Sequence, residues 1–291
     1  MVEQVLVNTL GNASLYALVG MGFALVYGVG RFFHAAHATT IAVGLYTAHV
    51  LCNQFGLSPC TWIPGAILGA VVTGILVEFL GYRPLRRANA GGLILLVASL
   101  SIVVIGDSIL AAWFGRVPRT LDAPWIRHSF TVGEATVTAV QLSALIGLLL
   151  ATGALWIVMH RTRVGLYLRA TASRSDLASL HGINPEAVSC LAIVAGSVLA
   201  GFAAVLVGLD TGFSPSTGFD LLLVGVVACL VAGARVWYGS LAGGLVLAAL
   251  NQLGVLYIGS EWQSTITFGV LLLILLIRPQ GLLEWQAPST G

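Results

Sequence analysis

Ionisable side chains inside apolar stretches are the feature of this sequence that points most directly to chemistry. Asp107 lies well inside the apolar stretch 93–114, and His37 stands at the start of another, 38–52. A charged group at the centre of a membrane helix costs about 2.5–3.5 kcal/mol on insertion scales, so it usually has a function or a partner. Asp107 is therefore expected to face a polar pathway or to bond a neighbouring helix. His37 is expected either to act at a gate or to be a satisfied packing residue.

The sequence contains no recognisable catalytic constellation. All 13 basic residues are arginine, so neither a Walker A lysine nor a Schiff-base lysine is available. Ser240 follows Gly239, but no G-x-S-x-G motif surrounds it. His34 and His37 are three residues apart with no third ligand nearby, which argues against a metal site. We therefore expect no catalytic residue, no ATPase site, no metal and no cofactor in this chain.

The composition predicts a membrane protein. Hydrophobic residues make up 58% and charged residues 8% of the 291 residues, and the mean hydropathy is +0.97. A soluble domain carries about 25% charged residues. The apolar runs are continuous rather than alternating, which is typical of membrane helices and not of a barrel. The net charge of +2, with arginines spread over the loops, gives no sign of nucleic-acid binding.

The apolar segments predict an all-α, polytopic helical membrane protein with about eight or nine transmembrane segments in a single domain, 1–291. Several segments are close to the lower limit of about 17 residues for a spanning helix. The region 219–257 is split by the polar stretch from Arg235 to Ser240, so it is a candidate for a broken or re-entrant helix. The nine segments are 5–30, 38–52, 61–82, 93–114, 135–159, 187–209, 219–236, 239–257 and 262–277.

The arginines predict the orientation. If the polar stretch 160–186 lies on the cytoplasmic side, ten arginines fall inside and three outside. This is the positive-inside bias of membrane proteins. It places the N-terminus outside, the C-terminus inside and the loop 115–133 outside, where we expect a small cap that meets an external partner. The inside set is Arg31, Arg83, Arg86, Arg87, Arg161, Arg163, Arg169, Arg174, Arg235 and Arg278, and the outside set is Arg116, Arg119 and Arg127.

The polar stretch 160–186 is predicted to contain a short helix from Ser173 to Leu180. Ser173 is its expected N-cap, a left-handed Gly182 is its expected end, and Pro185 bars its continuation. A short amphipathic helix between two spans has two interpretations. It lies on the lipid headgroups, or it fits a groove on a cytoplasmic partner.

Other residues predict local contacts. Glu78, near the end of its segment, is expected to pair with Arg83 or another arginine nearby. Cys52 and Cys60 bracket a short external loop and form either a disulfide or two free thiols.

Three G-x-x-x-G pairs indicate close helix contacts, although such spacing also arises by chance when glycine is abundant. The pairs are Gly65 with Gly69, Gly208 with Gly212, and Gly239 with Gly243.

Several motifs follow one another in an order and at a spacing that a known family shares. They are Tyr16-Ala17-Leu18, Ala36-His37, Arg83-Pro84-Leu85-Arg86-Arg87, then Gly165, Arg169-Ala170, Asp176, Ala178 and Gly182-Ile183-Asn184, then Pro215, Gly218 and Arg278-Pro279-Gln280-Gly281-Leu282. With these motifs the chain resembles the permease subunits of branched-chain amino acid (leucine/isoleucine/valine-type) ABC importers, almost from end to end. His34 and Ala35 depart from the asparagine and phenylalanine that are usual there.

The resemblance implies a multi-pass permease in the cytoplasmic (inner) membrane of a prokaryote that passes an amino acid or a similar small solute. It implies two ATP-binding subunits, a homologous permease subunit (identical or not) and an external solute-binding protein as partners. The stretch 160–186 would be the ATPase-coupling loop, and the pathway candidates would be Tyr16, His37, Asp107 and Ser240. The coupling residues would be Gly165, Arg169, Ala170, Asp176, Ala178, Gly182 and Ile183.

Alternatives stay open at this point. For Arg169 and Asp176 the alternative to ATPase contact is a solvated internal ion pair. A secondary transporter or channel would use Asp107 and His37 as ion sites and would not need the coupling loop. An intramembrane enzyme is disfavoured because no nucleophile motif is present. Within the ABC hypothesis, urea, short amides or a sugar are the other solutes.

Overall fold

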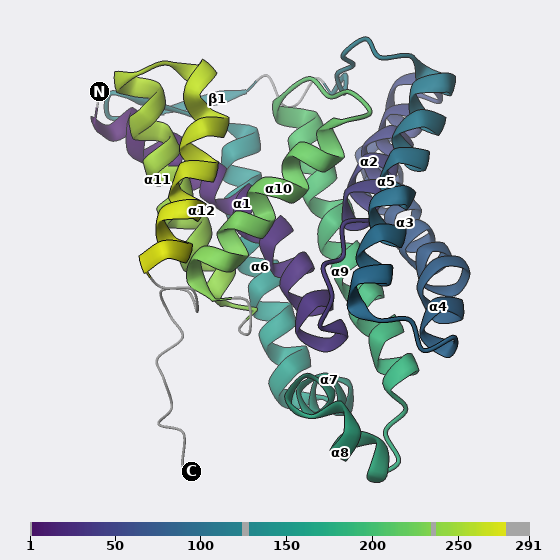
Figure 1. Ribbon diagram of the computed structural model, residues 1–291. Helices are drawn as coiled ribbons and strands as arrows, with labels where there is room; N and C mark the ends of the chain where they lie inside the picture. The colour runs from purple at the N-terminus through teal and green to yellow at the C-terminus, as the bar shows by residue number, and fades with distance from the viewer. Residues whose placement is uncertain (1, 124–127, 234–236, 278–291) are drawn as a thin grey trace.

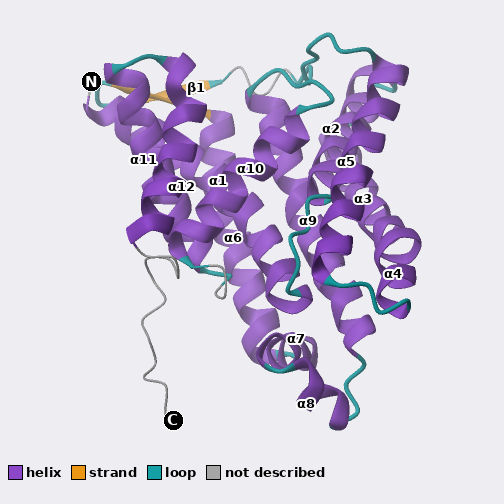
Figure 2. Ribbon diagram, viewed as in Figure 1, coloured by secondary structure: helices purple, strands orange, loops and turns teal. Residues whose placement is uncertain are grey.

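The computed structural model describes residues 2–123, 128–233 and 237–277. Within them the chain is a bundle of helices with one small hairpin (Figures 1 and 2). Each of the predicted apolar segments contains one main helix, which confirms the polytopic helical fold. These helices are α1 (Val2–Gly30), α2 (His37–His49), α3 (Pro59–Leu76), α5 (Gly92–Phe114), α6 (Ala139–Arg161), α9 (Pro185–Asp210), α10 (Thr217–Ala232), α11 (Gly239–Tyr257) and α12 (Gln263–Ile277).

In the described ranges, six helical segments are long and apolar enough to cross a bilayer: α1, α5, α6, α9, α11 and the segment that starts with α3. This last segment continues through the π-helical turns η2 (Val77–Tyr82) into α4 (Arg83–Arg87). The helices α2, α10 and α12 have 13, 16 and 15 residues. The 16 residues of α10 span roughly 24 Å, which is short of a hydrocarbon layer of about 30 Å. Helix α2 continues into the π-helical turns η1 (Val50–Gln54), and the description of α12 ends at Ile277. The chain is therefore a multi-pass membrane protein that combines full-length and short helices.

Helix α1 is the centre of the bundle and packs against α6, α9, α10 and α11. Two glycines let its neighbours come close. A Cβ atom added to Gly20 would lie 2.9 Å from the carbonyl oxygen of Gly225 in α10, and one added to Gly22 would lie 3.0 Å from that of Gly196 in α9. Apolar helices in a bilayer gain stability mainly from such close backbone packing.

The chain between α1 and α2 is non-helical and buried. After Gly30, Arg31 takes a left-handed φ of 54°, and His34, Ala35 and Ala36 have no exposed surface. Figures 1 and 2 show this segment running from the end of α1 back into the bundle before α2 begins. Helix α2 therefore starts inside the protein.

Polar side chains of α5 hold this buried segment in place. The Ser99 hydroxyl accepts a hydrogen bond from the Ala35 amide at 3.3 Å. Its proton is shared between two carbonyl oxygens, that of Phe33 at 3.2 Å and that of Leu96 at 2.8 Å. Non-helical backbone at membrane depth needs such partners because no water is available there. A non-helical element thus lies between α1 and α2, where the sequence did not indicate one.

In the region 219–257 the structure shows two separate helices packed side by side, α10 and α11. Helix α10 ends at Ala232, and Gly233 follows with a φ of 113°. Arg235 and the rest of 234–236 lie outside the described residues. Gly243 explains the close packing, because an added Cβ would clash with the backbone of Ala228.

The other glycine pairs also lie at helix contacts. Gly65 and Gly69 of α3 face Leu51 and Thr47, which belong to α2 and its π-helical extension η1 (Val50–Gln54). Gly208 faces Leu121 and Leu45, whereas Gly212 has no neighbour closer than 3.5 Å. Five of the six glycines, counting Gly239 beside Ala232, therefore have a packing role that the spacing alone only suggested.

One end of the bundle carries the N-terminus and a hairpin (Figure 1). Strand β1 (Ser129–Val132) pairs antiparallel with β2 (Ala135–Thr138). Residues 135–138, predicted as the start of an apolar segment, are therefore a strand. Thr138 ends it by capping α6 in a reciprocal pair of hydrogen bonds with Gln141. We call this end of the molecule the hairpin end.

The segment 115–123 lies across the hairpin end. Arg119 forms an isolated β-bridge with Phe213, and the Asn53 amide donates to the Thr120 carbonyl at 3.1 Å. Pro124, Trp125 and Arg127 lie outside the described residues.

Cys52 is buried and Cys60 is exposed, and both are free thiols. The Cys52 thiol instead points to the Asp122 carbonyl oxygen at 3.6 Å.

The opposite end carries α7 (Arg163–Ser173) and α8 (Ser175–Leu180), which project below the bundle in Figure 1. Arg31 reaches α7, since its guanidinium donates to the Ala172 carbonyl at 2.6 Å. This end also carries α4, which lies toward it in Figure 1. We call it the arginine end. Its described arginines are Arg31, Arg83, Arg86, Arg87, Arg161, Arg163, Arg169 and Arg174, against Arg116 and Arg119 at the hairpin end.

Candidate functional site

The stretch 160–186 folds as two short helices rather than the single predicted one. Thr162 is extended and caps α7, since its hydroxyl accepts from the Gly165 amide at 3.2 Å. Ser173 is the last residue of α7 and not the N-cap of α8, which is Arg174. The prediction missed α7, although Gly165, Leu168 and Thr171 recur at a helical spacing of three and are all buried. That periodicity was the available signal.

Gly165 makes the sharp corner between α6 and α7 possible. A Cβ atom added there would clash with the Val158 carbonyl oxygen and with the backbone of Met159. The predicted coupling residue Gly165 is therefore buried in the corner. Arg169 is exposed one turn further along, and its Nε lies 3.4 Å from the Gly165 carbonyl oxygen.

The exit from α8 follows the prediction closely. Gly182 has a φ of 81°, the left-handed conformation expected of a helix-ending glycine. The amides of Gly182 and Ile183 donate to the carbonyls of Ser179 and Ala178. Ile183 then packs against the main hydrophobic core. Asn184 caps α9 by accepting from the amides of Glu186 and Ala187.

The outer face of α7 and α8 combines apolar and positively charged side chains. Ala178 is buried and Ala170 is half-buried, whereas Asp176 and the arginines are exposed. Leu180 is 81% and Leu166 54% exposed, which is costly unless lipid or a partner covers them. We call this face the α7–α8 surface. Its exposed members are Arg163, Val164, Leu166, Tyr167, Arg169, Arg174, Asp176, Leu177 and Leu180.

Ion pairs tie the neighbouring helices together at the arginine end. Arg83 and Arg87 of α4 lie 3.1 Å and 3.5 Å from the carboxylate of Glu186, in the first turn of α9. Glu78 is buried and pairs with Arg86, one of the nearby arginines that the sequence offered. Because Glu186 directly follows the α8 exit, these pairs connect α4 with the α7–α8 surface.

A buried polar cluster surrounds the start of α2. His34 and His37 have no exposed surface, and their ring centres lie 5.7 Å apart. The Nδ1 atom of His34 lies 2.7 Å from the Tyr82 hydroxyl. Neither ring nitrogen of His37 has a hydrogen-bond partner among the described residues, and its ring packs against Gly22 of α1. His37 is thus in the core and not on an open surface.

Asp107 lies in a groove of about 300 Å³ between α2, α5 and the start of α10. One carboxylate oxygen is 3.7 Å from the Arg116 guanidinium. The other is buried without a hydrogen-bond partner among the described residues. Asp107 is about two turns from the end of α5 at Phe114, which is where the predicted segment 93–114 placed it. The residues lining this groove are Ala38, Thr39, Ala42, Leu100, Val103, Val104, Asp107, Pro215, Ser216 and Phe219.

Tyr16 and Ser240, the other two predicted pathway residues, lie outside the Asp107 groove. The Tyr16 hydroxyl is 3.5 Å from the Gln263 amide, between α1 and α12. Ser240 is fully buried at the start of α11, and its side chain packs against Gly20. Neither residue lines the Asp107 groove, so the four predicted pathway residues do not form one site.

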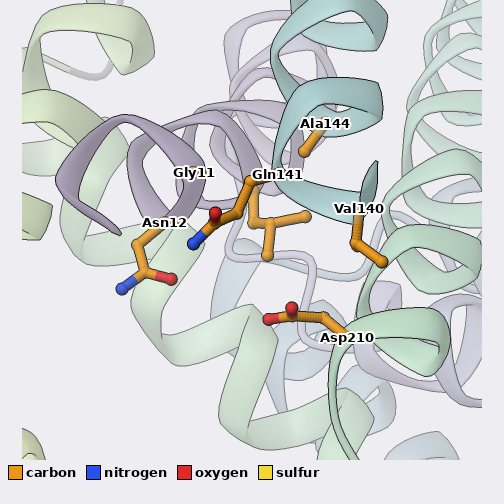
Figure 3. A pocket seen from close by; sticks show the side chains of 7 residues that line it. Gly11, Asn12, Val140, Gln141, Ala144 and Asp210 are labelled. Atoms are coloured by element: carbon orange, nitrogen blue, oxygen red, sulfur yellow. The ribbon is translucent and has the colours of Figure 1, made fainter. Parts of the chain in front are cut away.

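A second pocket at the hairpin end is too small for a solute. It lies between Asn12, Gln141 and Asp210 (Figure 3) and holds about 10 Å³. That volume is about the size of one water molecule. The Asp107 groove is the larger of the two described pockets.

Sequence reasoning missed several polar partners. Tyr82 and Ser99 stand singly inside apolar segments, where a hydroxyl group was the available signal for an internal hydrogen bond. Arg116 was counted only for orientation. Among the described residues no group of three metal-ligating side chains lies close together, and His34 with His37 alone would be an incomplete set.

The comparisons with known proteins agree on one family. A family model described as branched-chain amino acid transport system, permease component, matches residues 5–276. The permease protein BraD of Pseudomonas aeruginosa is 28% identical, over 96% of this chain and 95% of its own. In Escherichia coli, LivH is 28% identical over 96% and 94% of the two chains, and LivM is 22% identical over 94% and 69%. All three are described as high-affinity branched-chain amino acid transport system permease proteins.

Solved structures share the fold. PsaBC from Streptococcus pneumoniae, solved with a Fab, matches with a TM-score of 0.54 and 12% identity over 95% of this chain and 92% of that chain. An inward-facing metal-chelate type ABC transporter matches with a TM-score of 0.51 and 18% identity over 90% and 85%. At these identities the likeness concerns the arrangement of helices alone.

Proposed function

Because this chain belongs to the branched-chain amino acid transport permease family, we propose that it is a transmembrane subunit of an ATP-binding-cassette importer. It passes branched-chain amino acids, delivered by an external binding protein, through the cytoplasmic membrane of a prokaryote. The domain 1–291 supplies the pathway and separate subunits supply the ATPase activity. The family match over nearly the whole chain is the observation that carries this proposal.

The α7–α8 surface is the proposed docking site for the ATPase subunits. Its exposed leucines and arginines suit a groove on a protein partner, in the manner of an amphipathic helix in a groove. The arginine excess at this end, eight against two among the described residues, supports a cytoplasmic position by the positive-inside rule. In this arrangement the hairpin end meets the binding protein.

The contacts of α7 and α8 supply two routes for movement. Arg31 joins α7 to the end of α1, and the buried segment that follows leads to α2. Asn184 and Glu186 join the α8 exit to α9, and Glu186 continues to α4 through Arg83 and Arg87. A displacement of the α7–α8 surface on ATP binding is therefore transmitted to α2, which lines the Asp107 groove, and to α9 and α4.

We also propose a homologous permease as partner. LivH and LivM of one organism are both similar to this chain, which supports a pair of related permease chains. Helix α5 leaves large side chains uncovered, with Trp113 80% and Leu93 74% exposed. Lipid or the second permease covers this face.

Reconstitution in proteoliposomes tests the function. The assembled transporter is expected to take up radiolabelled leucine only with ATP inside and loaded binding protein outside. This chain alone is expected to accumulate none. Accumulation by the chain alone, driven by a proton gradient, would instead support the secondary transporter that uses Asp107 and His37. Uptake of urea, a short amide or a sugar without leucine would refute the proposed solute class.

A further inference from the structure

The Asp107 groove has one feature that the proposed function does not use, which is an ion pair in an apolar setting. Its walls are formed mainly by Leu100, Val103, Val104 and Phe219, with Ala38 and Ala42 of α2 at the bottom. Ala38 and Ala42 are buried, whereas Val104 is 65% exposed. The groove is therefore open on one side of the bundle and closed behind.

The ion pair at the rim is incomplete. Asp107 is 25% exposed and Arg116 is 74% exposed, and their charged groups are 3.7 Å apart. The second carboxylate oxygen of Asp107 is buried without a partner among the described residues. A carboxylate on an apolar wall is stabilised by a positively charged hydrogen-bond donor. Most of the Arg116 side chain is not covered by other described residues.

We propose that this groove is the receiving site for the solute at the hairpin end, and that it accepts a zwitterionic α-amino acid with an aliphatic side chain. The ammonium group binds the partly exposed carboxylate of Asp107. The carboxylate binds the guanidinium of Arg116. The aliphatic side chain packs against Leu100, Val103, Val104 and Phe219. This inference rests on the proposed function and adds the site and the orientation of the solute.

The chemistry of the groove selects against the other solutes. A neutral amide or urea carries no positive charge for Asp107. A sugar would place several hydroxyl groups against apolar walls, where hydroxyls without partners are unfavourable. A volume of about 300 Å³ lies at the small end of the range of ligand sites, which suits a single small molecule. An aliphatic zwitterion matches both the charges and the walls.

The position of the groove suits entry from the hairpin end. Asp107 lies about two turns before Phe114, the last residue of α5. The opposite wall is the start of α10, with Pro215 and Ser216. Thr39 lines the inner part of the groove and is two residues from the buried His37. The solute thus meets the charged rim before it reaches the histidine cluster.

Two substitutions and one matched control test the site in the assembled transporter. Asp107→Asn and Arg116→Gln each remove one charge of the pair. Asp210→Asn is the control, because Asp210 lies at the same end and lines only the pocket of about 10 Å³. Leucine uptake below saturation is expected to fall about tenfold or more in the two groove variants, as for the loss of a hydrogen bond to a charged group. The control is expected to stay near wild type, and Asp107→Glu is expected to restore much of the uptake.

A binding measurement without the binding protein separates the groove from the delivery step. Saturation-transfer NMR on the transporter is expected to detect leucine, and to detect leucinamide and 4-methylpentanoate about tenfold more weakly, because each lacks one charge. The leucine signal is expected to persist in Asp210→Asn and to disappear in Asp107→Asn. If Asp107→Asn fails to assemble, Arg116→Gln carries the test, since its side chain is mostly exposed.

Each possible result supports or overturns a different part of the proposal. Equal leucine uptake and binding in Asp107→Asn and Asp210→Asn would overturn the groove proposal and leave the importer function standing. Equal binding of leucinamide and leucine would overturn the role of Arg116. A wild-type transporter that moves another solute but no amino acid would refute the proposed function itself.

Discussion

Gly165 has no room for even the single methyl group of alanine. Helix α7 turns back against α6 at this residue, and an added Cβ would meet backbone atoms of Val158 and Met159. Backbone atoms cannot rotate away as a flexible side chain can, so the corner requires glycine. Gly165 therefore sets the position of α7 relative to α6. We propose that its role in coupling is to position α7, while exposed side chains such as Arg169 make the contact with the ATPase.

We expect Gly165→Ala to destabilise the protein by about 1–3 kcal/mol, the usual cost of overpacking. Thermal unfolding of the detergent-purified chain measures the change. Gly153→Ala is the matched control, because Gly153 is an exposed glycine in α6 with nothing near an added Cβ. Alanine is favoured over glycine in helices by up to about 1 kcal/mol, so the control is expected to be neutral or slightly more stable. Equal stability of the two variants would contradict the corner role.

At the scale of elements, α7 and α8 act as one projecting unit with defined connections. Arg31 connects it to α1, and the Gly182 turn connects it to α9. The turn has few neighbours, and nothing lies within 4 Å of an added Cβ at Gly182. Its requirement for glycine is therefore one of backbone conformation rather than space.

We expect Gly182→Val to abolish solute-stimulated ATP hydrolysis while the chain still inserts and assembles. A β-branched residue at a φ of 81° costs about 1–2 kcal/mol or more, so the exit from α8 rearranges. Gly182→Asn is the matched variant, since asparagine tolerates the left-handed conformation. Stimulated hydrolysis that is the same in the valine and asparagine variants would show that the turn does not set the coupling.

At the scale of the whole molecule, the two ends of the bundle differ in charge and structure. The arginine end carries α4, α7 and α8, and the hairpin end carries the N-terminus and the hairpin (Figure 1). The Asp107 groove lies nearer the hairpin end, about two turns from the end of α5. Positively charged loops are retained in the cytoplasm. In the proposed orientation, the solute groove opens toward the outside and the proposed ATPase surface faces the cytoplasm, as an importer requires.

Labelling of cysteines in intact cells tests this orientation. A membrane-impermeant thiol reagent added outside is expected to label the exposed Cys60, near the hairpin end. Ser179→Cys, in a chain that also carries Cys60→Ser, places an exposed thiol in α8. It is expected to react only after the membrane is permeabilised. Labelling of the α8 thiol in intact cells would invert the orientation and place the proposed ATPase surface outside.

Much of the fold was predictable because hydrophobic length is a local property of the sequence. Each of the nine predicted apolar runs contains one main helix in the described part of the chain, and Gly182 and Pro185 correctly marked the end of α8 and the start of α9. The features that the sequence did not predict involve partners that are distant in sequence. The non-helical stretch before α2 is stable because Ser99 of α5 satisfies its backbone. No residue near Phe33 in the sequence indicates that Ser99 is its hydrogen-bond partner.

The candidate site, like the fold, was predictable from the sequence only in part. The sequence by itself determined that the chain crosses a membrane, that it lacks a lysine-based ATPase site, and that Asp107 and His37 need an explanation, because each of these follows from residue type and neighbours. Only the tertiary structure decided that Asp107 faces an open groove with Arg116 while His37 is enclosed beside His34 and Tyr82. The reason is physical: whether a charged or polar group is exposed or paired depends on the helices that pack around it.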